Sequence, residues 1–357
     1  MIVVYAEDFA KTYWLKNVIS LAEIAYYNDT GKITITAPAD ELNISALRVG
    51  NLVYDTDRKL LFLLMHTKVD TNNLQITADG KSAECILNRR VSAEDITITN
   101  IENGVYDAIN RNLRGLDIIQ TAPVKGLSEE FKAESQDESG GNSEDVNEAS
   151  VRGEQLLDAI TPFLENGELG RRIIWDAQGK KITFEIYKGV DRTEGIHRVV
   201  FSTEQGTCRD LVIDTDDSTF YNCAAAAWEW DGGPWMNYVG KHWNASDREL
   251  WVDTGVSGSG SGEEFAKKKG EAVAKAAEKL SEYVNRQSFT ATIPAGDLGR
   301  RYELGDIVTC ASVKYGVNFN ARITSLKYTL DANQEKTEIV LGKPALTVIE
   351  EVKMLVN

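Results

Sequence analysis

The sequence is poor in the residues from which catalytic and metal sites are most often built. Among its 357 residues are three histidines and four cysteines. The histidines form no HExxH, HxH or Cys/His zinc motif, and the cysteines form no CxxC pair. Isolated cysteines of this kind are typical of small buried side chains in a protein made in a reducing cytosol. We therefore expect no metal ion, no cofactor and no hydrolase built on histidine.

Motifs for phosphate, calcium and acyl chemistry are missing or incomplete. No GxGxxG or GxxxxGK[ST] loop occurs. Asp214-Thr215-Asp216-Asp217 lacks the glycine and the distal glutamate of a calcium loop, which favours an acidic turn. In Gly255–Gly262 glycine and serine alternate apart from Val256, which favours a flexible connector over a GxSxG nucleophile elbow. The sequence marks no catalytic residue, and we expect a protein that is not an enzyme.

Long apolar runs and a basic balance are also absent. No stretch approaches the 18 apolar residues of a membrane helix, and the first residues lack a signal-peptide pattern, so we expect no membrane span and synthesis in the cytoplasm. Lys and Arg number 39 against 55 Asp and Glu, a net charge of −16. Because a nucleic-acid duplex repels such a protein, specific binding is not expected. An acidic surface can instead be a wall past which DNA slides.

What the sequence does contain is a similar stretch near each end. Residues Gly50 to Gly80 read as β-strands with a turn at Asp70, and residues Gly305 to Gly342 read the same way with a turn at Asp331. The first glycine, the turn aspartate and the last glycine are offset by about 255, 261 and 262 positions, which fits one loop insertion. Two similar β-modules suit a pseudo-symmetric ring better than an enzyme. Chance similarity between two hairpins is the alternative.

The fold class that we expect is α+β and β-rich, with two similar β-barrel modules plus smaller α/β domains. Strands at short, regular spacing predict the barrels. The expected segments are a first β-barrel module (1–98), an α/β domain (99–196) with an acidic mobile loop (126–150), a β segment with a tryptophan cluster (197–254), a linker and amphipathic helix (255–286), a second β-barrel module (287–346) and a C-terminal tail (347–357).

Two helices are predicted in the α/β domain. The first begins near Asn100, where Thr99 and Glu102 have capping-box spacing. The second covers about Arg152–Asn166, and Gly167 closes it. Their apolar faces are Ile101, Val105, Ala108 and Ile109 in the first helix, and Leu156, Leu157, Ile160, Phe163 and Leu164 in the second.

Five of the seven tryptophans lie in one short region, at positions 228, 230, 235, 243 and 251. Indole rings offer a large contact area at a low entropy cost, so a platform for a glycan or a protein partner is one interpretation. A hairpin with Trp228 and Trp230 on one face over a core is the other. We favour packing or a subunit contact. The possible interface aromatics are Trp228, Trp230, Trp235 and Trp243.

Six phrases occur along the chain in a recognisable order. They are Gly153-Glu154-Gln155-Leu156-Leu157-Asp158-Ala159, Gly170-Arg171-Arg172-Ile173, Phe184-Glu185-Ile186-Tyr187-Lys188-Gly189-Val190-Asp191-Arg192-Thr193, Val200-Phe201-Ser202, Arg248-Glu249-Leu250-Trp251-Val252-Asp253 and Tyr302-Glu303-Leu304-Gly305-Asp306-Ile307-Val308-Thr309. In that order they resemble the tail-tip hub proteins of siphophages and related prophages, the hub-like part of the tail-associated proteins. The resemblance runs from the first strands to Gly342. The family-motif structural positions are Arg248, Glu249, Asp253, Tyr302, Leu304, Gly305 and Asp306.

The resemblance implies a hub of mixed β-barrels and small α/β domains, similar to the hub of contractile tails and the base of type VI secretion spikes. Members of that family form homotrimers, and two similar barrels per subunit present a quasi-sixfold ring to the hexameric tail. The implied partners are a distal tail ring protein, a tape measure protein and receptor-binding or fibre proteins. The implied location is the virion tail tip, after assembly in the bacterial host cytoplasm.

We therefore predict a structural tail-tip or baseplate hub of a long-tailed bacteriophage or prophage. It would close the distal tail tube, connect it to receptor-binding parts and take part in DNA passage at ejection. One alternative is a cell-wall-degrading tail-associated enzyme, a glycosidase or peptidase that uses buried acids and the tryptophan cluster. The other is the hub of a contractile injection spike, which shares the fold and differs in its partners.

Overall fold

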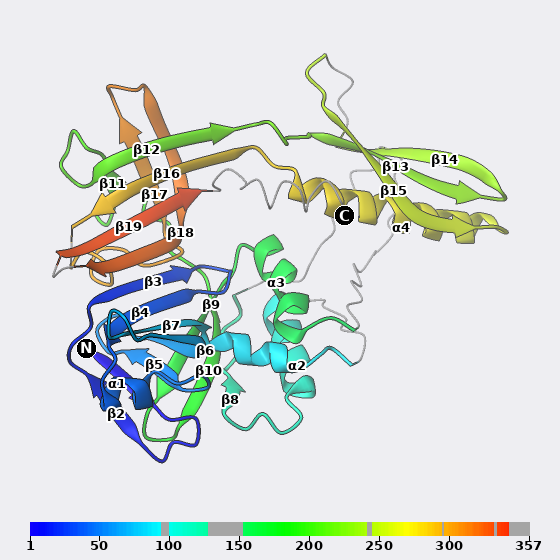
Figure 1. Ribbon diagram of the computed structural model, residues 1–357. Coiled ribbons are helices and arrows are strands. Elements are labelled where there is room, and N and C mark those ends of the chain that lie inside the picture. Colours follow the sequence, from blue (N-terminus) through cyan, green and yellow to red (C-terminus); the bar gives the residue numbers. More distant parts are fainter. Residues whose placement is uncertain (94–99, 128–152, 241–244, 295, 332–333, 343–357) are drawn as a thin grey trace. The chain divides into compact units, whose positions relative to one another are not determined.

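The computed structural model describes residues 1–93, 100–127, 153–240, 245–294, 296–331 and 334–342 (Figure 1). Strands outnumber helices, so the β-rich fold class is confirmed. The chain divides into two compact units, residues 1–211 with 290–341 and residues 212–289 with 342–357. Within the described ranges, no helix is long and apolar enough to span a membrane. The predicted acidic loop and the C-terminal tail fall mostly or wholly outside these ranges.

The first module is an antiparallel sheet in the N-terminal part of the first unit. Its strands are β1 (Ile2–Tyr5), β2 (Thr12–Leu15), β3 (Ser20–Tyr26), β4 (Lys32–Pro38), β5 (Leu52–Asp55), β6 (Leu60–Asp70) and β7 (Gln75–Ser82), with helix α1 (Glu41–Ala46) between β4 and β5. They pair in the order β3-β4-β7-β6-β5-β1-β2. Along β4, Ile33, Ile35 and Ala37 are buried and alternate with more exposed residues, as period two requires.

The second module repeats this arrangement. Its strands are β11 (Val200–Phe201), β12 (Arg209–Asp216), β16 (Arg286–Ile293), β17 (Ile307–Ser312), β18 (Val317–Asp331) and β19 (Gln334–Gly342). The order β12-β16-β19-β18-β17 matches β3-β4-β7-β6-β5 both along the chain and across the sheet. The duplication expected from the sequence is therefore present. Closure of either module into a barrel stays a prediction.

The two modules also share individual backbone hydrogen bonds at equivalent positions. Gly50 and Gly305 have φ of +91° and +94°, a region that favours glycine. Gly50 donates its N–H to the Leu64 carbonyl at 2.9 Å, and Gly305 donates to the Ile323 carbonyl at 2.9 Å. A β-bulge follows directly after Leu64 in β6 and after Ile323 in β18. Since a bulge changes the twist of both hairpins at the same place, the two modules share local geometry as well as topology.

The register corrects one part of the predicted repeat. Leu64 is paired with Gly80, whereas Ile323 is paired with Leu341. Gly80 therefore corresponds to Leu341, and the proposed match between Gly80 and Gly342 is wrong by one residue. The two hairpins differ in length beyond the bulge, since β6 pairs as far as Asp70 with Gln75 and β18 as far as Asp331 with Gln334, and sequence similarity does not show this difference.

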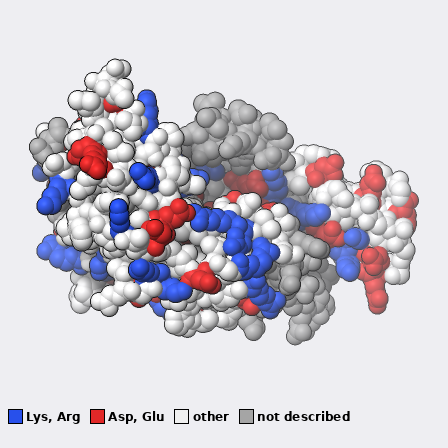
Figure 2. All heavy atoms as spheres, turned by 60° about the horizontal axis from the view of Figure 1, so that its bottom comes forward, with Lys and Arg blue, Asp and Glu red and all other residues white. Residues whose placement is uncertain are grey.

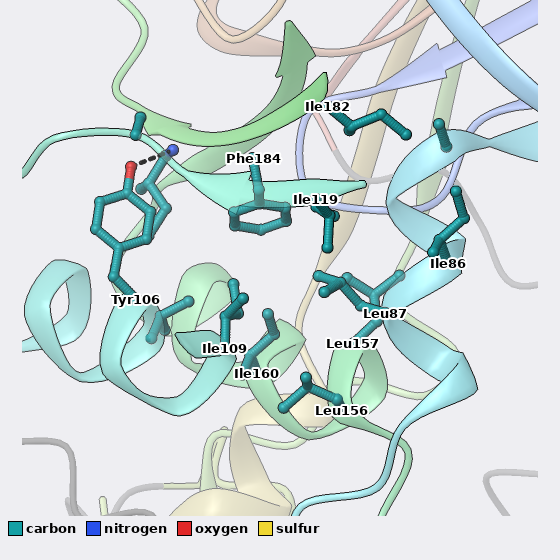
Figure 3. Packing of buried hydrophobic residues seen from close by; sticks show 14 of the residues in the cluster. Ile86, Leu87, Tyr106, Ile109, Ile119, Leu156, Leu157, Ile160, Ile182 and Phe184 are labelled. Carbon is teal, nitrogen blue, oxygen red and sulfur yellow. Dashed lines mark hydrogen bonds between the residues drawn. The ribbon is translucent and has the colours of Figure 1, made fainter. Parts of the chain in front are cut away.

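A small α/β domain follows the first module. It contains a 3₁₀ helix η1 (Ala83–Arg89), helix α2 (Ile101–Asn112), strand β8 (Ile119–Thr121), helix α3 (Leu156–Asn166) and strands β9 (Gly170–Asp176) and β10 (Lys181–Tyr187). The sheet order is β8-β10-β9. Side chains of α2, α3 and η1 pack on Ile119, Ile182 and Phe184 in one core (Figure 3). The predicted apolar faces of both helices lie in or against this core.

The predicted ends of these helices need two corrections. Asn100 caps α2 by accepting a hydrogen bond from the Asn103 N–H at 3.0 Å, and Thr99 lies outside the described residues. Helix α3 begins at Leu156 rather than near Arg152, because Gly153 has a φ of +85° that no helix contains.

The second unit contains a three-stranded sheet covered by one long helix. Its elements are β13 (Cys223–Trp230), β14 (Gly233–Val239), β15 (Glu249–Gly258) and α4 (Gly262–Glu282), and the sheet order is β14-β13-β15. The flexible connector predicted for Gly255–Gly262 is wrong at Gly255–Gly258, which continue β15. The backbones of Ser257 and Gly258 pair with Glu229 and Trp230, and Val256 is buried. Tertiary pairing overrides the weak strand preference of a Gly/Ser sequence.

Tyr27 joins both modules to the α/β domain within the first unit. Its side chain is 1% exposed. Its N–H donates to the Thr324 carbonyl at 3.0 Å, and its own carbonyl accepts from the Arg171 N–H at 2.8 Å. A Cβ atom added at Gly170 or at Gly305 would lie 2.2 Å from the Tyr27 ring. The ring therefore occupies space that only glycine leaves free.

We predict that Gly305→Ala destabilises the protein by about 3 kcal/mol or more, because it combines a positive φ with a collision against the Tyr27 ring. Gly299→Ala is the matched control. Gly299 has a φ of +76°, but a Cβ atom there meets nothing within 4 Å. The control should cost only about 1–2 kcal/mol. Urea unfolding monitored by circular dichroism measures both, and equal costs would contradict the packing role of Tyr27.

Candidate assembly surface

One strand pair joins the two modules into a continuous sheet. Ser20–Tyr26 of β3 run antiparallel to Ser325–Asp331 of β18, and we call this pairing the seam. Tyr328 of β18 is 7% exposed and packs in the hydrophobic core of the first module. The seam therefore buries part of the second module in the core of the first, and it shows how one module of this kind joins another.

The strand equivalent to β18 in the first module has an open edge. After its bulge, His66–Asp70 of β6 pair with β7 on one side. In the part of the chain that the structure describes, no strand pairs with the other side. Counting from the bulge in each strand, Val69 of β6 is equivalent to Tyr328 of β18. Val69 is 46% exposed. An apolar side chain of β6 is thus exposed at the position whose equivalent in β18 is buried in the seam.

The strand equivalent to β3 also has an open edge. β12 pairs with β16 on one side, and no other described strand pairs with it. Val212 on β12 is 58% exposed. Unpaired strand edges readily pair with another chain unless they are covered. The chain therefore carries one open edge of the β18 type and one of the β3 type, the two kinds that meet in the seam.

The predicted family-motif positions do not form one site. Tyr302, Leu304, Gly305 and Asp306 lie in the first unit, and Arg248, Glu249 and Asp253 lie in the second.

The first group fixes the loop that ends at Gly305. The Asp306 Oδ1 atom accepts from the Val190 N–H at 2.8 Å, and its Oδ2 atom accepts from Arg192 Nε at 2.5 Å. The Leu304 carbonyl accepts from the Tyr187 hydroxyl at 3.1 Å. Tyr302 is buried. These residues hold Gly305 in place against Tyr27, which is a structural role.

The second group lies near the start of β15. Arg248 forms an ion pair with Asp217 at 2.9 Å, and its N–H donates to the Asn222 side chain at 2.7 Å. Glu249 is the first residue of β15, and Asp253 accepts a hydrogen bond from the Gly255 N–H at 3.1 Å. These contacts fasten the loops around the sheet. They bring no two carboxyl groups together in the manner of a glycosidase.

The tryptophan cluster is mainly packing under helix α4. Trp228 and Trp230 are 3% and 7% exposed, and each ring centroid lies 5.2 Å from that of Phe265. Trp235 lies 4.9 Å from the same ring and stays 47% exposed. The core interpretation of Trp228 and Trp230 fits this geometry. Trp243 lies outside the described residues, and an interface role of Trp235 stays a prediction.

Sequence reasoning missed the residues that join the modules. Glu23 lies in β3, and Tyr27 comes directly after this strand. Leu21 and Glu23 point to the same buried face of β3, so a glutamate at an inward position of an alternating strand was the signal that the sequence offered. Among the residues with described positions, no group of three or more His, Cys, Asp or Glu side chains could hold a metal ion.

We predict that Phe265→Ala destabilises the second unit by about 3 kcal/mol, because it leaves a cavity between Trp228 and Trp230. Trp251→Ala is the control, since Trp251 is 65% exposed and lies outside that cluster. It should cost less than about 1 kcal/mol. Thermal unfolding followed by tryptophan fluorescence measures both variants. A larger loss for Trp251→Ala would reverse the assignment of the cluster to the core.

Comparisons with known proteins agree with this architecture. The family model of the siphovirus ReqiPepy6 Gp37-like protein matches residues 1–343. No curated protein sequence matches the chain.

Three solved structures share the fold. The prophage tail protein gp18 from Listeria monocytogenes EGD-e is 14% identical with a TM-score of 0.52, and the match covers 100% of this chain and 99% of that one. The tail protein from Neisseria meningitidis MC58 is 11% identical with a TM-score of 0.57, covering 96% of each chain. The 43 kDa tail protein of prophage MuSo2 from Shewanella oneidensis is 11% identical with a TM-score of 0.57, covering 96% and 98%.

Proposed function

Because this chain belongs to the family of siphovirus ReqiPepy6 Gp37-like proteins, we propose that it is a structural hub at the tip of a long phage tail. The family and the shared fold make it a phage tail protein. Its position at the tip, its assembly state and its part in DNA passage are our proposal. The observation that carries the proposal is the pair of open strand edges described above.

The seam supplies the geometry for joining one copy to the next. Within the chain, a β18-type edge meets a β3-type edge. Each copy still has a β18-type edge on β6 and a β3-type edge on β12. Pairing β6 of one copy with β12 of the next reproduces the seam between chains, and such head-to-tail contacts close into a ring when the rotation allows. Around such a ring, the seam within each chain would alternate with the β6–β12 pairing between chains, because each chain carries two similar modules.

Three copies give a ring of six similar modules. A homotrimer of this kind presents six nearly equivalent surfaces to a sixfold tail tube, which resolves the mismatch between threefold and sixfold symmetry. On this proposal the partners are a distal tail ring protein and a tape measure protein on one side, and receptor-binding or fibre proteins on the other. The tail tip of the virion is the corresponding location.

DNA passage through the ring fits the charge of the chain. The net charge of −16 gives a wall that repels the DNA backbone, so DNA crosses it without specific binding. On the face drawn in Figure 2, lysines and arginines lie among the acidic residues, so the acidic excess is not gathered there. The proposal places acidic residues on the bore of the ring, a surface that exists only in the assembly.

A hub of a contractile injection spike is the second candidate, since it would use the same modules with different partners. Nothing in the described geometry favours an enzyme over a structural part.

We predict that Val69→Glu weakens self-association at least about tenfold, because it places a charge on the open edge of β6, at the position equivalent to the buried Tyr328 of the seam. Ile174→Glu on β9 is the matched control, since Ile174 is also 46% exposed and belongs to a different sheet from β6 and β12. The measurement is sedimentation velocity over a concentration series, in which wild type and control should reach three times the monomer mass of 39.5 kDa.

Two outcomes of this experiment would count against the ring. One is a wild-type chain that stays monomeric throughout the series and also within purified tails examined by electron microscopy. The other is an equal loss of association in Val69→Glu and Ile174→Glu, which would place the contact elsewhere.

We also propose that the chain is not a cell-wall hydrolase, and we predict no clearing zone on zymograms of host cell walls. A clearing zone that one carboxylate substitution abolishes would favour the glycosidase or peptidase instead.

A further inference from the structure

A polar cluster is buried in the first module directly beside the seam. Glu23 on β3 is 1% exposed and Asp55 on β5 is 0% exposed. Arg58, in the turn between β5 and β6, reaches both carboxyl groups. Tyr328 of the second module is paired with Glu23 in the seam. Buried charges are costly unless they are compensated, so the charge balance of this cluster matters to the contact between modules.

Arg58 is the cation at the centre of the cluster. Its Nη1 atom lies 3.3 Å from Glu23 Oε2 and forms an ion pair with Asp55. Its guanidinium carbon lies 3.1 Å from the centroid of the Tyr328 ring, which is a cation–π contact. One side chain of the first module thus holds two acids of its own module and an aromatic ring of the other.

The cluster has two buried carboxyl groups for one cation, Arg58, whose side chain is 24% exposed. The other groups that face it are the Met1 amino group, 3.9 Å from Asp55 Oδ1, and Glu335, which lies close enough to Tyr328 to act on its hydroxyl group. No group in the described part of the chain donates to the Oε1 atom of Glu23. A proton on Glu23 removes one negative charge from the cluster, and Asp55 is the neighbouring acceptor for it. Burial first, and then the neighbouring Asp55, raise the pKa of Glu23 to about 8.

We propose that the seam is a proton-dependent junction, in which the proton on Glu23 holds β3 against β18 and its loss lets the two strands separate. The seam lies within one chain, so this inference does not rest on the proposed ring or on its function. It assigns a second role to β3, whose other edge is fixed by pairing with β4.

The sign of the effect follows from the two states of Glu23. When the seam opens to water, the pKa of Glu23 returns toward its ordinary value of 4.5. The closed seam therefore binds the proton more tightly than the open one. The proton stabilises the closed seam fully below about pH 4.5. Between about pH 4.5 and about pH 8, the equilibrium constant for opening rises about tenfold per pH unit. Above about pH 8 this stabilisation is lost. Mild acid closes the seam, and mild alkali loosens it.

The test is hydrogen exchange of the full chain from about pH 5 to about pH 9, analysed by mass spectrometry and corrected for intrinsic exchange. In the wild type, the opening equilibrium of peptides covering Ser20–Tyr26 and Ser325–Asp331 should rise by about tenfold per pH unit up to about pH 8. Peptides covering β9 and β10 should change less. An equal pH dependence throughout the chain would mean a global stability effect and would overturn the proposal.

Glu23→Gln tests the residue directly. It keeps the shape and a neutral charge, so the seam should stay protected and lose its pH dependence. Asp79→Asn is the control, because Asp79 on β7 is an exposed acid whose removal should leave the wild-type slope. An unchanged slope in Glu23→Gln would overturn the assignment to Glu23.

A second variant keeps the test decisive if Glu23→Gln folds poorly. Asp55→Asn removes the competing carboxylate and leaves Glu23 alone with Arg58. The pH dependence of the seam should then move to lower pH. A seam without any pH dependence above about pH 5 in Asp55→Asn would overturn the proposal, because burial, the larger cause, still raises the pKa of Glu23.

Discussion

The packing of one tyrosine ring against two glycines holds the first unit together. The Tyr27 ring fills the space beside Gly170 and Gly305, where a Cβ atom would lie 2.2 Å from it. The Tyr27 hydroxyl donates to the Glu168 carbonyl at 3.0 Å and accepts from the Gly189 N–H at 3.2 Å. The contact therefore fixes the α/β domain, the end of β3 and the start of β17 at one point. The seam begins at the residue before Tyr27, so its register depends on the same contact.

The second unit enters the fold without disturbing the repeat. Its strands β13, β14 and β15 and its helix α4 lie along the chain between β12 and β16, where the first module has only the turn between β3 and β4. A connection between two antiparallel strands is a place where an insertion is tolerated, since neither strand has to change its partners. This insertion explains why the modules look different in sequence although their strands follow the same order.

Sequence alone predicted the features that depend on local chemistry. Gly50 and Gly305 stood out in the sequence as anchors of the repeat, and both have a positive φ, which favours glycine; the faces of α2 and α3 follow from helical periodicity. Pairing between distant strands was not predictable. The Gly/Ser stretch became part of β15 because β13 provides hydrogen-bonding partners, and the correct match of Gly80 depends on the register of the paired strands. Glu23 sat at an inward position of β3, but only the structure places Asp55 and Arg58 around it.

The two equivalent edges differ in a way that their proposed roles explain. In the seam, Tyr328 is buried with Arg58 and two acids, a contact that forms as the chain folds because both partners are always present. On β6 the equivalent residue is Val69, and its neighbours His66 and Lys68 are polar and exposed. A small apolar residue among polar ones keeps a free strand edge from pairing with unrelated chains. The proposed contact between copies then depends on main-chain pairing at high local concentration, so it is weaker than the seam and forms at the last step of assembly.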